Sequence, residues 1–553
     1  MQRVFKRVLI PFVILAYLLL TFFQFHTRNI FNTTPINSNQ SYKTGIFDDL
    51  RILKCYKWYK QCNQIMEGYD SDGNELIWNR VEKNLDIYGQ PPNFWSIYTE
   101  YLYVHIPNKG RFGSTGRAIV DLALGDPMSK DPPFYVVNDA QTRITKPKSR
   151  LDATFNYKNW ELKSDGIWAK YDRANSEDVL NNIQYFFGNN VVDPRQDWKL
   201  LNGKLRSRAY LSIHRGSLNS KGEIRRQVPI LTEINNEFKI IQISDLHFNS
   251  KSGDCKDQFN ENGAIPCKAD SKTLNFINEV LDIETPDFAI ITGDLLDGFQ
   301  VQDYQTAILK ALNPLIKRSI PFAIAFGDND VNEFASKYEI IKFISDLPMS
   351  MMDGINEKQQ HHNSIIGFEN NYAFKVFDSQ NEHLQSVIYV LDLFQGDQET
   401  NEQSKFLYNF YNELQDKPKF SLEFQHQPIQ EYRPKSAFAI VGKYNEKGKL
   451  NINSDSNLRK TLSDLNVNAM SVGYEHTNEC CIHGEDNENG NNLNPLWMCY
   501  GGATGEGGYG NKDINFERRV RFFRINSEKM EITSWKRKQT DPQSVFDYQY
   551  IYN

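Results

Sequence analysis

Two residues with metal-binding side chains, Asp245 and His247, follow directly after the apolar run Phe238–Ile243. Side chains alternate along an extended strand, so we expect both to leave the strand on the same side. Four later apolar runs also end in residues of ligand type, namely Asp294, Asp328, His426 and His476. Ligands bind beyond the carboxyl ends of strands in α/β folds, so these side chains should meet at one edge of a sheet. The sequence therefore predicts a metal site.

A pair of metal ions is suited to the hydrolysis of phosphate esters. This reaction needs an activated water and neutralisation of the charge on the phosphoryl oxygens, and two ions about 3.5–4 Å apart supply both. A carboxylate can bridge the ions, while imidazoles and amide oxygens complete their shells. Asp294 follows Gly293, which permits a tight turn, and we predict that Asp294 is the bridging ligand.

The elements that must position these residues alternate between strands and helices from Phe238 onward. The segment 271–284 has the helical pattern of apolar residues, with Asp270 or Ser271 as the expected N-cap. A second helix is predicted over 304–319, where Pro314 predicts a kink or a break. After about Tyr372 the strands come with fewer helices. We expect an α/β fold in which two sheets pack together beneath outer helices.

The order of the motifs resembles that of the calcineurin-like metallophosphoesterases, most closely the purple-acid-phosphatase-like branch of fungi and plants. That family carries DxH, GDxxx, GNHD, a lone His and GHxH in this order. The corresponding segments here are Asp245-Leu246-His247, Gly293-Asp294, Gly327-Asp328-Asn329-Asp330, His426 and Gly473-Tyr474-Glu475-His476. The resemblance covers about residues 191–525. It implies a four-layer α/β/β/α sandwich that hydrolyses phosphomonoesters, including those of phosphoproteins.

The resemblance also implies the roles of particular residues. The implied metal ligands are Asp245, His247, Asp294, Asp328, His426 and His476, and the implied catalytic residues are Asn329 and Asp330. The ligand set of one metal position is complete, because it needs only Asp245, His247, Asp294 and His476. The other keeps Asp294 and His426. The implied cofactor is one divalent or trivalent ion of manganese, iron or zinc, with two ions as the alternative.

Departures from the family pattern fall on the second metal position. Asp328 replaces the family's metal-binding Asn, and it is either a ligand or a turn residue. Asn329 replaces a His and cannot donate a proton near neutral pH, and loss of a general acid typically costs about 10²–10⁴ in rate. Tyr474, in place of a His, either fills the vacated space or binds iron as phenolate, and Glu475 is a substitute ligand to consider. Asp330 either orients its neighbours or caps a helix that begins near residue 331.

The chain of 553 residues is too long for one core. We expect the following segments: 1–27 a cytosolic stub and signal-anchor helix, 28–76 a stalk, 77–219 a β-rich accessory domain, 220–237 a linker, 238–540 the phosphoesterase domain and 541–553 a C-terminal tail. The glycine-rich run Gly501–Gly510 lacks the lysine of a nucleotide-binding loop, so we expect a tight loop beneath the rim of the site.

The N-terminus predicts a membrane anchor. The run Val8–Phe25 carries no charge and reaches about 27 Å as a helix, enough to span a bilayer. Arg3, Lys6 and Arg7 precede it, which predicts a cytosolic N-terminus and a lumenal or extracellular C-terminal domain. A cleaved signal peptide is the alternative, although no cleavage site of small residues follows. The prediction is a single-pass type II membrane protein of the endoplasmic reticulum, vacuole or plasma membrane.

The cysteines and the tripeptides beyond the anchor agree with a secretory compartment. Asn32 and Asn39 begin glycosylation acceptor sequences. Cys55 with Cys62, and Cys255 with Cys267, have the spacing of small disulfide loops, and a further pair can form among Cys480, Cys481 and Cys499. Seven cysteines leave one thiol over. Zinc binding by these cysteines is disfavoured because none of their spacings forms a CxxC pair.

The function expected from the sequence is that of a membrane-anchored phosphoesterase with reduced or lost activity. One alternative keeps full activity with an altered metal pair. Another is a pseudophosphatase that binds a phosphorylated partner protein and regulates signalling or membrane transport. A nucleic-acid partner is excluded, because the net charge is −6 and no nucleic-acid-binding motif occurs.

Overall fold

The computed structural model describes most of the chain outside the N-terminus. The described residues are 34–36, 45–56, 62–69, 75–81, 83–85, 98–107, 116–125, 159–173, 178–206, 208–216, 228–257, 266–298, 301–330, 335–352, 365–368, 371–392, 402–434, 438–450, 457–484, 493–514 and 516–553. The anchor expected at Val8–Phe25 and the acceptors Asn32 and Asn39 lie outside them. Among the helices of the described ranges, none has both the length and the apolar character needed to cross a bilayer.

The chain divides into two compact units. The first comprises Met1–Tyr185 and Asp197–Ile224, and the second comprises Phe186–Gln196 and Arg225–Asn553. The short segment Phe186–Gln196 therefore groups with the phosphoesterase-like part, which differs from the single β-rich domain expected over 77–219.

The first unit is built from strands that form three small sheets. One sheet has the order β1-β3-β4-β5-β2, a second β6-β8-β7 and a third β10-β11-β9. Their bounds are β1 Thr34–Ile36, β2 Asp49–Tyr56, β3 Gln64–Tyr69, β4 Glu75–Arg80, β5 Tyr98–His105, β6 Arg117–Leu124, β7 Trp160–Leu162, β8 Ile167–Arg173, β9 Val179–Phe187, β10 Trp198–Leu200 and β11 Ala209–Gly216.

The described part of the segment expected as a stalk, 28–76, belongs to this first unit. In β2, Leu50 and Ile52 lie opposite Val104 and Leu102 of β5. This alternation of apolar residues forms a sheet, although the polar composition around it favoured a stalk. Cys55 of β2 forms a disulfide with Cys62, as expected.

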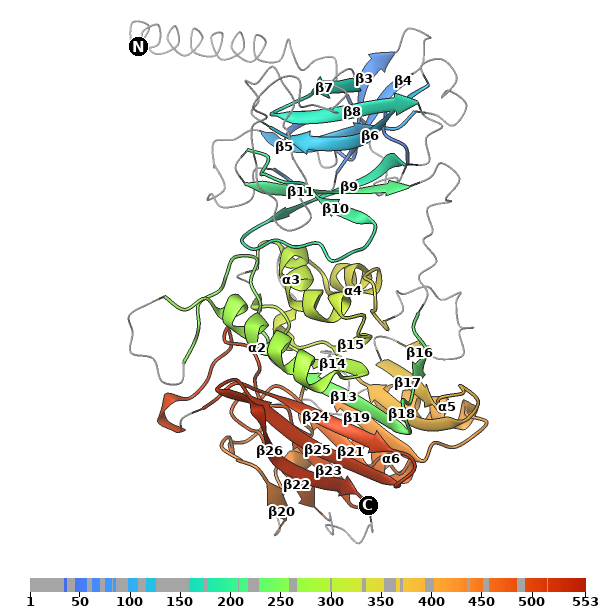
Figure 1. Cartoon of the computed structure of the whole chain (residues 1–553), viewed down its shortest axis with the longest axis vertical. Helices are drawn as coiled ribbons and strands as arrows, with labels where there is room; N and C mark the ends of the chain where they lie inside the picture. The colour runs from blue at the N-terminus through green and yellow to red at the C-terminus, as the bar shows by residue number, and fades with distance from the viewer. Residues whose placement is uncertain are drawn as a thin grey trace, which may run out of the picture. The chain divides into compact units, whose positions relative to one another are not determined.

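Two sheets form the second unit (Figure 1). The β13 sheet has the order β15-β14-β13-β24-β25-β26, in which β13, β14 and β15 run parallel. The β19 sheet has the order β12-β17-β18-β19-β21-β23-β22-β20, with β16 beside β17. The bounds are β12 Leu231–Thr232, β13 Glu237–Ile243, β14 Phe288–Thr292, β15 Phe322–Ala325, β16 Ile365–Phe368, β17 Asn371–Phe377, β18 Leu384–Val390, β19 Phe420–Gln425, β20 Ala439–Val441, β21 Ala469–Val472, β22 Cys481–Gly484, β23 Leu496–Tyr500, β24 Arg519–Asn526, β25 Glu531–Lys538 and β26 Asp541–Tyr552.

Helices cover the outer faces of these sheets. Their bounds are α2 Ala269–Glu284, α3 Tyr304–Lys317, α4 Lys337–Ser345, α5 Glu402–Glu413 and α6 Leu458–Asp464. In Figure 1, α2, α3 and α4 lie together, and Glu284 of α2 accepts hydrogen bonds from Trp535 and Arg537 of β25. Helices α5 and α6 share a core with the β19 sheet, where Phe406 and Leu462 pack in one cluster with Tyr389.

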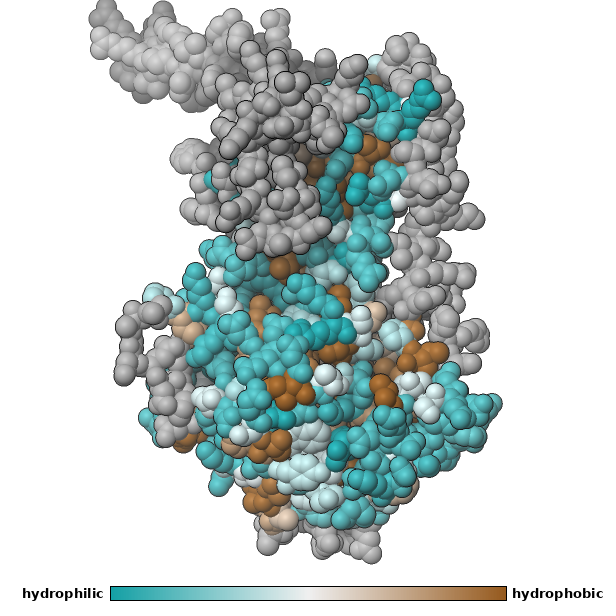
Figure 2. Space-filling model, in the orientation of Figure 1, coloured by the Kyte–Doolittle hydropathy of each residue, from teal (hydrophilic) through white to brown (hydrophobic). Residues whose placement is uncertain are grey.

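The two sheets pack face to face through buried aromatic and polar side chains. Phe288 of β14 meets Phe374 of β17 with ring centroids 5.4 Å apart, and Phe424 of β19 meets Phe523 of β24 at 5.5 Å. The face drawn in Figure 2 is mainly hydrophilic where described atoms are visible, with small scattered hydrophobic patches. Many apolar side chains of both sheets are buried. The expected pair of packed sheets beneath outer helices agrees with the structure.

Two local expectations differ from the structure. Helix α2 has Lys268 as its N-cap without a side-chain hydrogen bond, so neither Asp270 nor Ser271 is the cap. Asp270 lies in the first turn, where it pairs with the buried Lys310 of α3 at 2.5 Å. Helix α3 continues through Pro314 to Lys317 without a break, because a proline in the last turn removes only one late backbone donor.

The segment 541–553, expected as a tail, adds a strand to the β13 sheet. In β26 the side chains of Gln549 and Ile551 are buried, whereas those of Tyr548, Tyr550 and Tyr552 are about half exposed. This alternation has the period of a strand that is covered on one face. The C-terminus therefore belongs to the domain.

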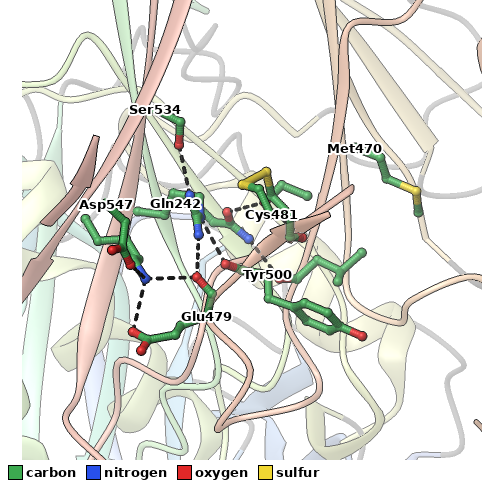
Figure 3. The surroundings of a disulfide bond; sticks show 12 residues. Gln242, Met470, Glu479, Cys481, Tyr500, Ser534 and Asp547 are labelled. Atoms are coloured by element: carbon green, nitrogen blue, oxygen red, sulfur yellow. Dashed lines mark hydrogen bonds and ion pairs between the residues drawn. A yellow bond between two sulfur atoms is a disulfide. The ribbon is translucent and has the colours of Figure 1, made fainter. Parts of the chain in front are cut away.

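The remaining disulfides lie in the second unit. Cys255 pairs with Cys267, Cys481 pairs with Cys499, and Cys480 stays a buried thiol. The sequence prediction of small disulfide loops with one thiol left over is confirmed. Cys481 and Cys499 are opposite one another on β22 and β23, next to Tyr500 (Figure 3).

A buried group of charges lies beside this disulfide. The carboxylate of Glu479 forms ion pairs with Arg519 of β24 and with Lys536 of β25, and the Lys536 contact measures 3.1 Å. The backbone oxygen of Glu479 also accepts a hydrogen bond from Arg521 at 2.7 Å. Glu479, Asp547 and Ser534 are visible around the disulfide in Figure 3. These contacts fix the segment that follows His476 against the β13 sheet.

Candidate metal centre

Four of the residues that the sequence singled out meet in one buried cluster. Asp245, His247, Asp294 and His476 each offer one ligand atom, and these atoms all lie within 4.8 Å of one another. They come from the ends of β13, β14 and β21, which are neighbouring strand ends of the two sheets. The structure thus brings together the complete set expected for one metal position.

Turns, and not strand alternation, direct these side chains. Strand β13 ends at Ile243, and Asp245, His247 and Asp294 have positive φ angles of 51°, 48° and 50°. Such a backbone costs about 1–3 kcal/mol at a residue other than glycine. Backbone hydrogen bonds from Asp245 N to Gly293 O (3.1 Å) and from His247 N to Asp294 O (2.9 Å) hold the two loops together. The prediction that an extended strand aims Asp245 and His247 is wrong, although both reach the cluster.

The ligand atoms of the cluster face one another at short distances. The Nε2 atoms of His247 and His476 are 3.3 Å apart, and His476 Nε2 lies 3.5 Å from Asp245 Oδ1. Burial and the nearby His476 lower the pKa of His247 to about 4, so its imidazole is neutral and can act as a ligand. Asp245 Oδ2 is buried and has no hydrogen-bond partner among the described residues. An unpartnered buried carboxylate oxygen is costly and suits a cation.

Two of the imidazoles are oriented by backbone carbonyls. His476 Nδ1 contacts Tyr509 O at 2.8 Å, and His426 Nδ1 contacts Thr292 O at 3.0 Å. Such contacts fix the tautomer and turn Nε2 toward the centre, as is usual for histidine ligands of metals. His426 Nε2 is buried without a hydrogen-bond partner in the described structure and lies 3.6 Å from Asp294 Oδ1. His426 therefore borders the cluster on the side of Asp294.

Side-chain amides contact the two carboxylates that were expected at the second metal position. The backbone N–H of Asn329 donates to Asp294 Oδ1 at 3.0 Å and its amide donates to Oδ2 at 2.8 Å. The amide of Gln427 donates to both oxygens of Asp328, at 2.9 and 3.1 Å. Asp328 is exposed and lies outside the buried cluster. Of the residues predicted for this position, Asp328 is therefore not part of the cluster. Asn329 borders the cluster through its contact with Asp294.

The charge state of Asp294 reflects these contacts. Burial opposes its ionisation, but His426, His247 and the hydrogen bonds from Asn329 outweigh burial and hold the pKa of Asp294 below its usual value. Asp294 is therefore ionised and able to bind a cation, as expected for the bridging position.

Asp330 supports the loop that carries Asn329. Its carboxylate is buried and accepts hydrogen bonds from Leu296 N at 2.9 Å and Gly327 N at 2.8 Å. Burial and the nearby Asp294 raise its pKa to about 7. The next described helix, α4, begins at Lys337 and is capped by Ser336, so Asp330 orients its neighbours and does not cap that helix.

The residues that replace the family pattern near His476 have separate contacts. Tyr474 donates its backbone N–H to Asp245 Oδ1 at 3.2 Å and packs its ring edge-on against His426, with centroids 5.4 Å apart. It fills space beside the centre, as one of the two interpretations predicted. Glu475 pairs with Arg433 and accepts a hydrogen bond from the Tyr500 hydroxyl. The idea that Glu475 serves as a substitute ligand is therefore wrong.

The glycine-rich run packs directly beneath the ligands, as predicted. A Cβ added at Gly505 would lie 2.0 Å from Leu246 O, and one at Gly508 would lie 2.6 Å from the His476 ring. Only glycine allows this approach of the backbone. Sequence reasoning missed Gln427 and Tyr509 as neighbours of the site. Gln427 directly follows His426 in the sequence, and this adjacency was the available signal.

Comparisons with known proteins agree with this geometry. Residues 238–477 match the family described as calcineurin-like phosphoesterase. Protein SIA1 of Kluyveromyces lactis is 32% identical over 558 residues, which cover 92% of this chain and 90% of the relative. Phosphatase DCR2 of Saccharomyces cerevisiae is 29% identical, over 87% of this chain and 82% of its own.

A similar plant protein is named as inactive. The probable inactive purple acid phosphatase 28 of Arabidopsis thaliana is 26% identical over 59% of this chain and 86% of its own length. Because the match to the fungal SIA1 extends over nearly the whole of both chains, this protein belongs to the calcineurin-like metallophosphoesterase family.

Proposed function

We propose that this chain is a metal-dependent phosphoesterase that hydrolyses phosphomonoesters slowly with one bound ion. The observation that carries the proposal is the buried cluster of Asp245, His247, Asp294 and His476, whose ligand atoms lie within 4.8 Å of one another. When bound, the ion supplies Lewis-acid stabilisation of the charge that develops on the phosphoryl oxygens.

The residues of the cluster fit such an ion. Two carboxylates and two imidazoles form an oxygen and nitrogen donor set that suits manganese, iron or zinc. The unpartnered Asp245 Oδ2 is a further acceptor, and the carbonyls of Thr292 and Tyr509 hold the imidazoles of His426 and His476 in place. We propose one ion per chain, because the amides of Asn329 and Gln427 already donate to the carboxylates of Asp294 and Asp328.

The same contacts explain the slow rate. Asn329 has no ionisable proton near neutral pH, so it does not protonate a leaving group. Asp328 adds negative charge beside the site and repels the phosphate dianion. The substitution at Asn329 removes a general acid, and general acid catalysis is worth about 10²–10⁴ in rate.

A non-catalytic role is the second candidate. The two amide contacts, from Asn329 to Asp294 and from Gln427 to Asp328, favour it because they occupy the groups of the second metal position. In that case the chain is a pseudophosphatase whose site binds a phosphorylated partner protein and regulates a signalling or membrane-transport partner.

Turnover of 4-nitrophenyl phosphate separates the two candidates. We expect manganese-loaded protein to hydrolyse it measurably and Asp294→Asn to lower kcat/KM at least about 100-fold, because the variant loses a charged ligand. Asp513→Asn, at an exposed position, is the matched control and should retain the parent rate. Equal rates for the parent and Asp294→Asn would reject the enzymatic function and leave the pseudophosphatase.

Restoring the family motif should restore catalysis. The double variant Asp328→Asn with Asn329→His replaces the extra negative charge and supplies an imidazole proton donor. We expect kcat to rise about 100-fold or more, since general acid catalysis contributes about 10²–10⁴. The measurement is kcat at saturating substrate, with the single Asp328→Asn variant as the control. An unchanged kcat would show that the substitutions at these positions do not limit the rate.

We also propose that the chain is a single-pass type II membrane protein of the secretory pathway, in the endoplasmic reticulum, vacuole or plasma membrane. The support is the uncharged run Val8–Phe25 after three basic residues, together with disulfides that form in oxidising compartments.

Translation with endoplasmic reticulum microsomes tests this topology. We expect added protease to leave the C-terminal domain intact until detergent opens the vesicles. The translated chain should also lose mass on glycosidase treatment, whereas Asn32→Gln with Asn39→Gln should not. Digestion of the C-terminal domain in closed vesicles would contradict the topology.

A further inference from the structure

The ring of Tyr509 lies flat against a residue of the metal cluster. Its centroid is 3.8 Å from that of the His476 imidazole, and the two planes are inclined by only 10°. Tyr509 belongs to the glycine-rich run, whose backbone passes beneath His247 and His476. This aromatic ring therefore borders the metal centre.

Hydrogen bonds at both ends hold the ring in this position. The Tyr509 hydroxyl accepts from His476 N at 3.1 Å and donates to Glu446 Oε2 at 3.0 Å. Its carbonyl oxygen contacts His476 Nδ1 at 2.8 Å and accepts from Arg518 at 3.0 Å. The ring is thus oriented before any ligand arrives, and binding to a preorganised surface loses little conformational entropy.

Part of this ring nevertheless stays open to solvent. Tyr509 is 42% exposed, although His476 covers one face and the hydroxyl has two partners. The exposed part of the residue therefore lies away from the face that His476 covers. A purely structural tyrosine explains the contacts to Glu446 and His476, but it does not require a rigid open aromatic face beside a metal site.

Three basic side chains in the described part of this region have partners. Arg518 donates to the carbonyl oxygens of Gly508 and Lys256, and Arg433 pairs with Glu475. Lys256 Nζ lies 3.3 Å from Asp297. The Tyr474 ring, packed on His426, adds a second aromatic group at the centre. These three basic side chains are therefore already engaged. The rings of Tyr509 and Tyr474 are left as the surface that the organic part of a substrate can contact.

We propose that the site takes phosphomonoesters whose organic group is aromatic, and that this group stacks on the open face of Tyr509. The proposal rests on the phosphoesterase function proposed above and adds a substrate class to it. Tyr509 is then a specificity determinant, while the metal cluster holds the phosphoryl group. Stacked aromatic pairs give about a three- to tenfold gain in affinity beyond the buried area.

Binding of phosphonates tests the proposal without turnover. The probes are phenylphosphonate and cyclohexylphosphonate, which carry the same charged group and rings of similar size. We expect the manganese-loaded full-length protein to bind the phenyl compound about three- to tenfold more tightly. Tyr509→Phe should keep this ratio of Kd values, because it keeps the ring, and Tyr509→Leu should reduce the ratio to near one. Tyr548→Leu, at an exposed tyrosine of β26, is the matched control and should keep the ratio.

Two results would overturn the proposal. One is equal binding of the two phosphonates by the unaltered protein, and the other is a phenyl preference that survives in Tyr509→Leu. A peptide that carries phosphonomethyl-phenylalanine identifies the source of the aryl group. Tighter binding of the peptide than of phenylphosphonate supports a tyrosine-phosphorylated protein, and equal binding supports a small aryl phosphate.

The failure of this proposal differs from the failure of the phosphoesterase function. If the protein prefers phenylphosphonate but hydrolyses no ester, the proposal of aromatic specificity stands and the proposal of enzymatic function fails. If the protein hydrolyses phenyl and cyclohexyl phosphate with equal KM, the proposal of enzymatic function stands and the proposal that Tyr509 determines specificity fails.

Discussion

The metal centre depends on the cost of burying several ligand atoms close together, one of which, Asp245 Oδ2, has no hydrogen-bond partner among the described residues. Asp245 is fully buried, and the Nε2 atoms of His247 and His476 face each other at 3.3 Å beside it. Buried carboxylates and imidazole lone pairs in close contact are unfavourable unless a cation or a proton lies among them. The rest of the second unit keeps the four ligand side chains together despite the cost of burying them.

That framework acts through the backbone. Positive φ angles at Asp245, His247 and Asp294 aim the side chains, and the glycine-rich run passes so close to His476 that a Cβ at Gly508 would collide with its ring. The buried ion pairs of Glu479 with Arg519 and Lys536 then anchor the segment after His476. The packed sheets thus hold a strained, polar site in place, as is common where function requires a fixed geometry.

The sequence allowed much of this to be predicted, because ligand residues after apolar runs are a local signal. Asp245, His247, Asp294 and His476 meet as expected, and two disulfides pair as the spacing of their cysteines indicated. Two of the failures have a common cause, since they concern contacts between segments far apart in the chain. Asn329 contacts Asp294 and Glu475 pairs with Arg433, and neither partner can be read from local pattern. The strand β26 was missed because its exposed tyrosines obscured the alternation.

The central claim is that one cation binds at Asp245, His247, Asp294 and His476 and that amide groups replace a second cation. Anomalous X-ray diffraction from crystals of the manganese-loaded protein tests this claim most directly. The account predicts one anomalous peak within ligand distance of these four residues and no peak beside Asp328. Two peaks that share Asp294, or no peak at the cluster, would contradict it.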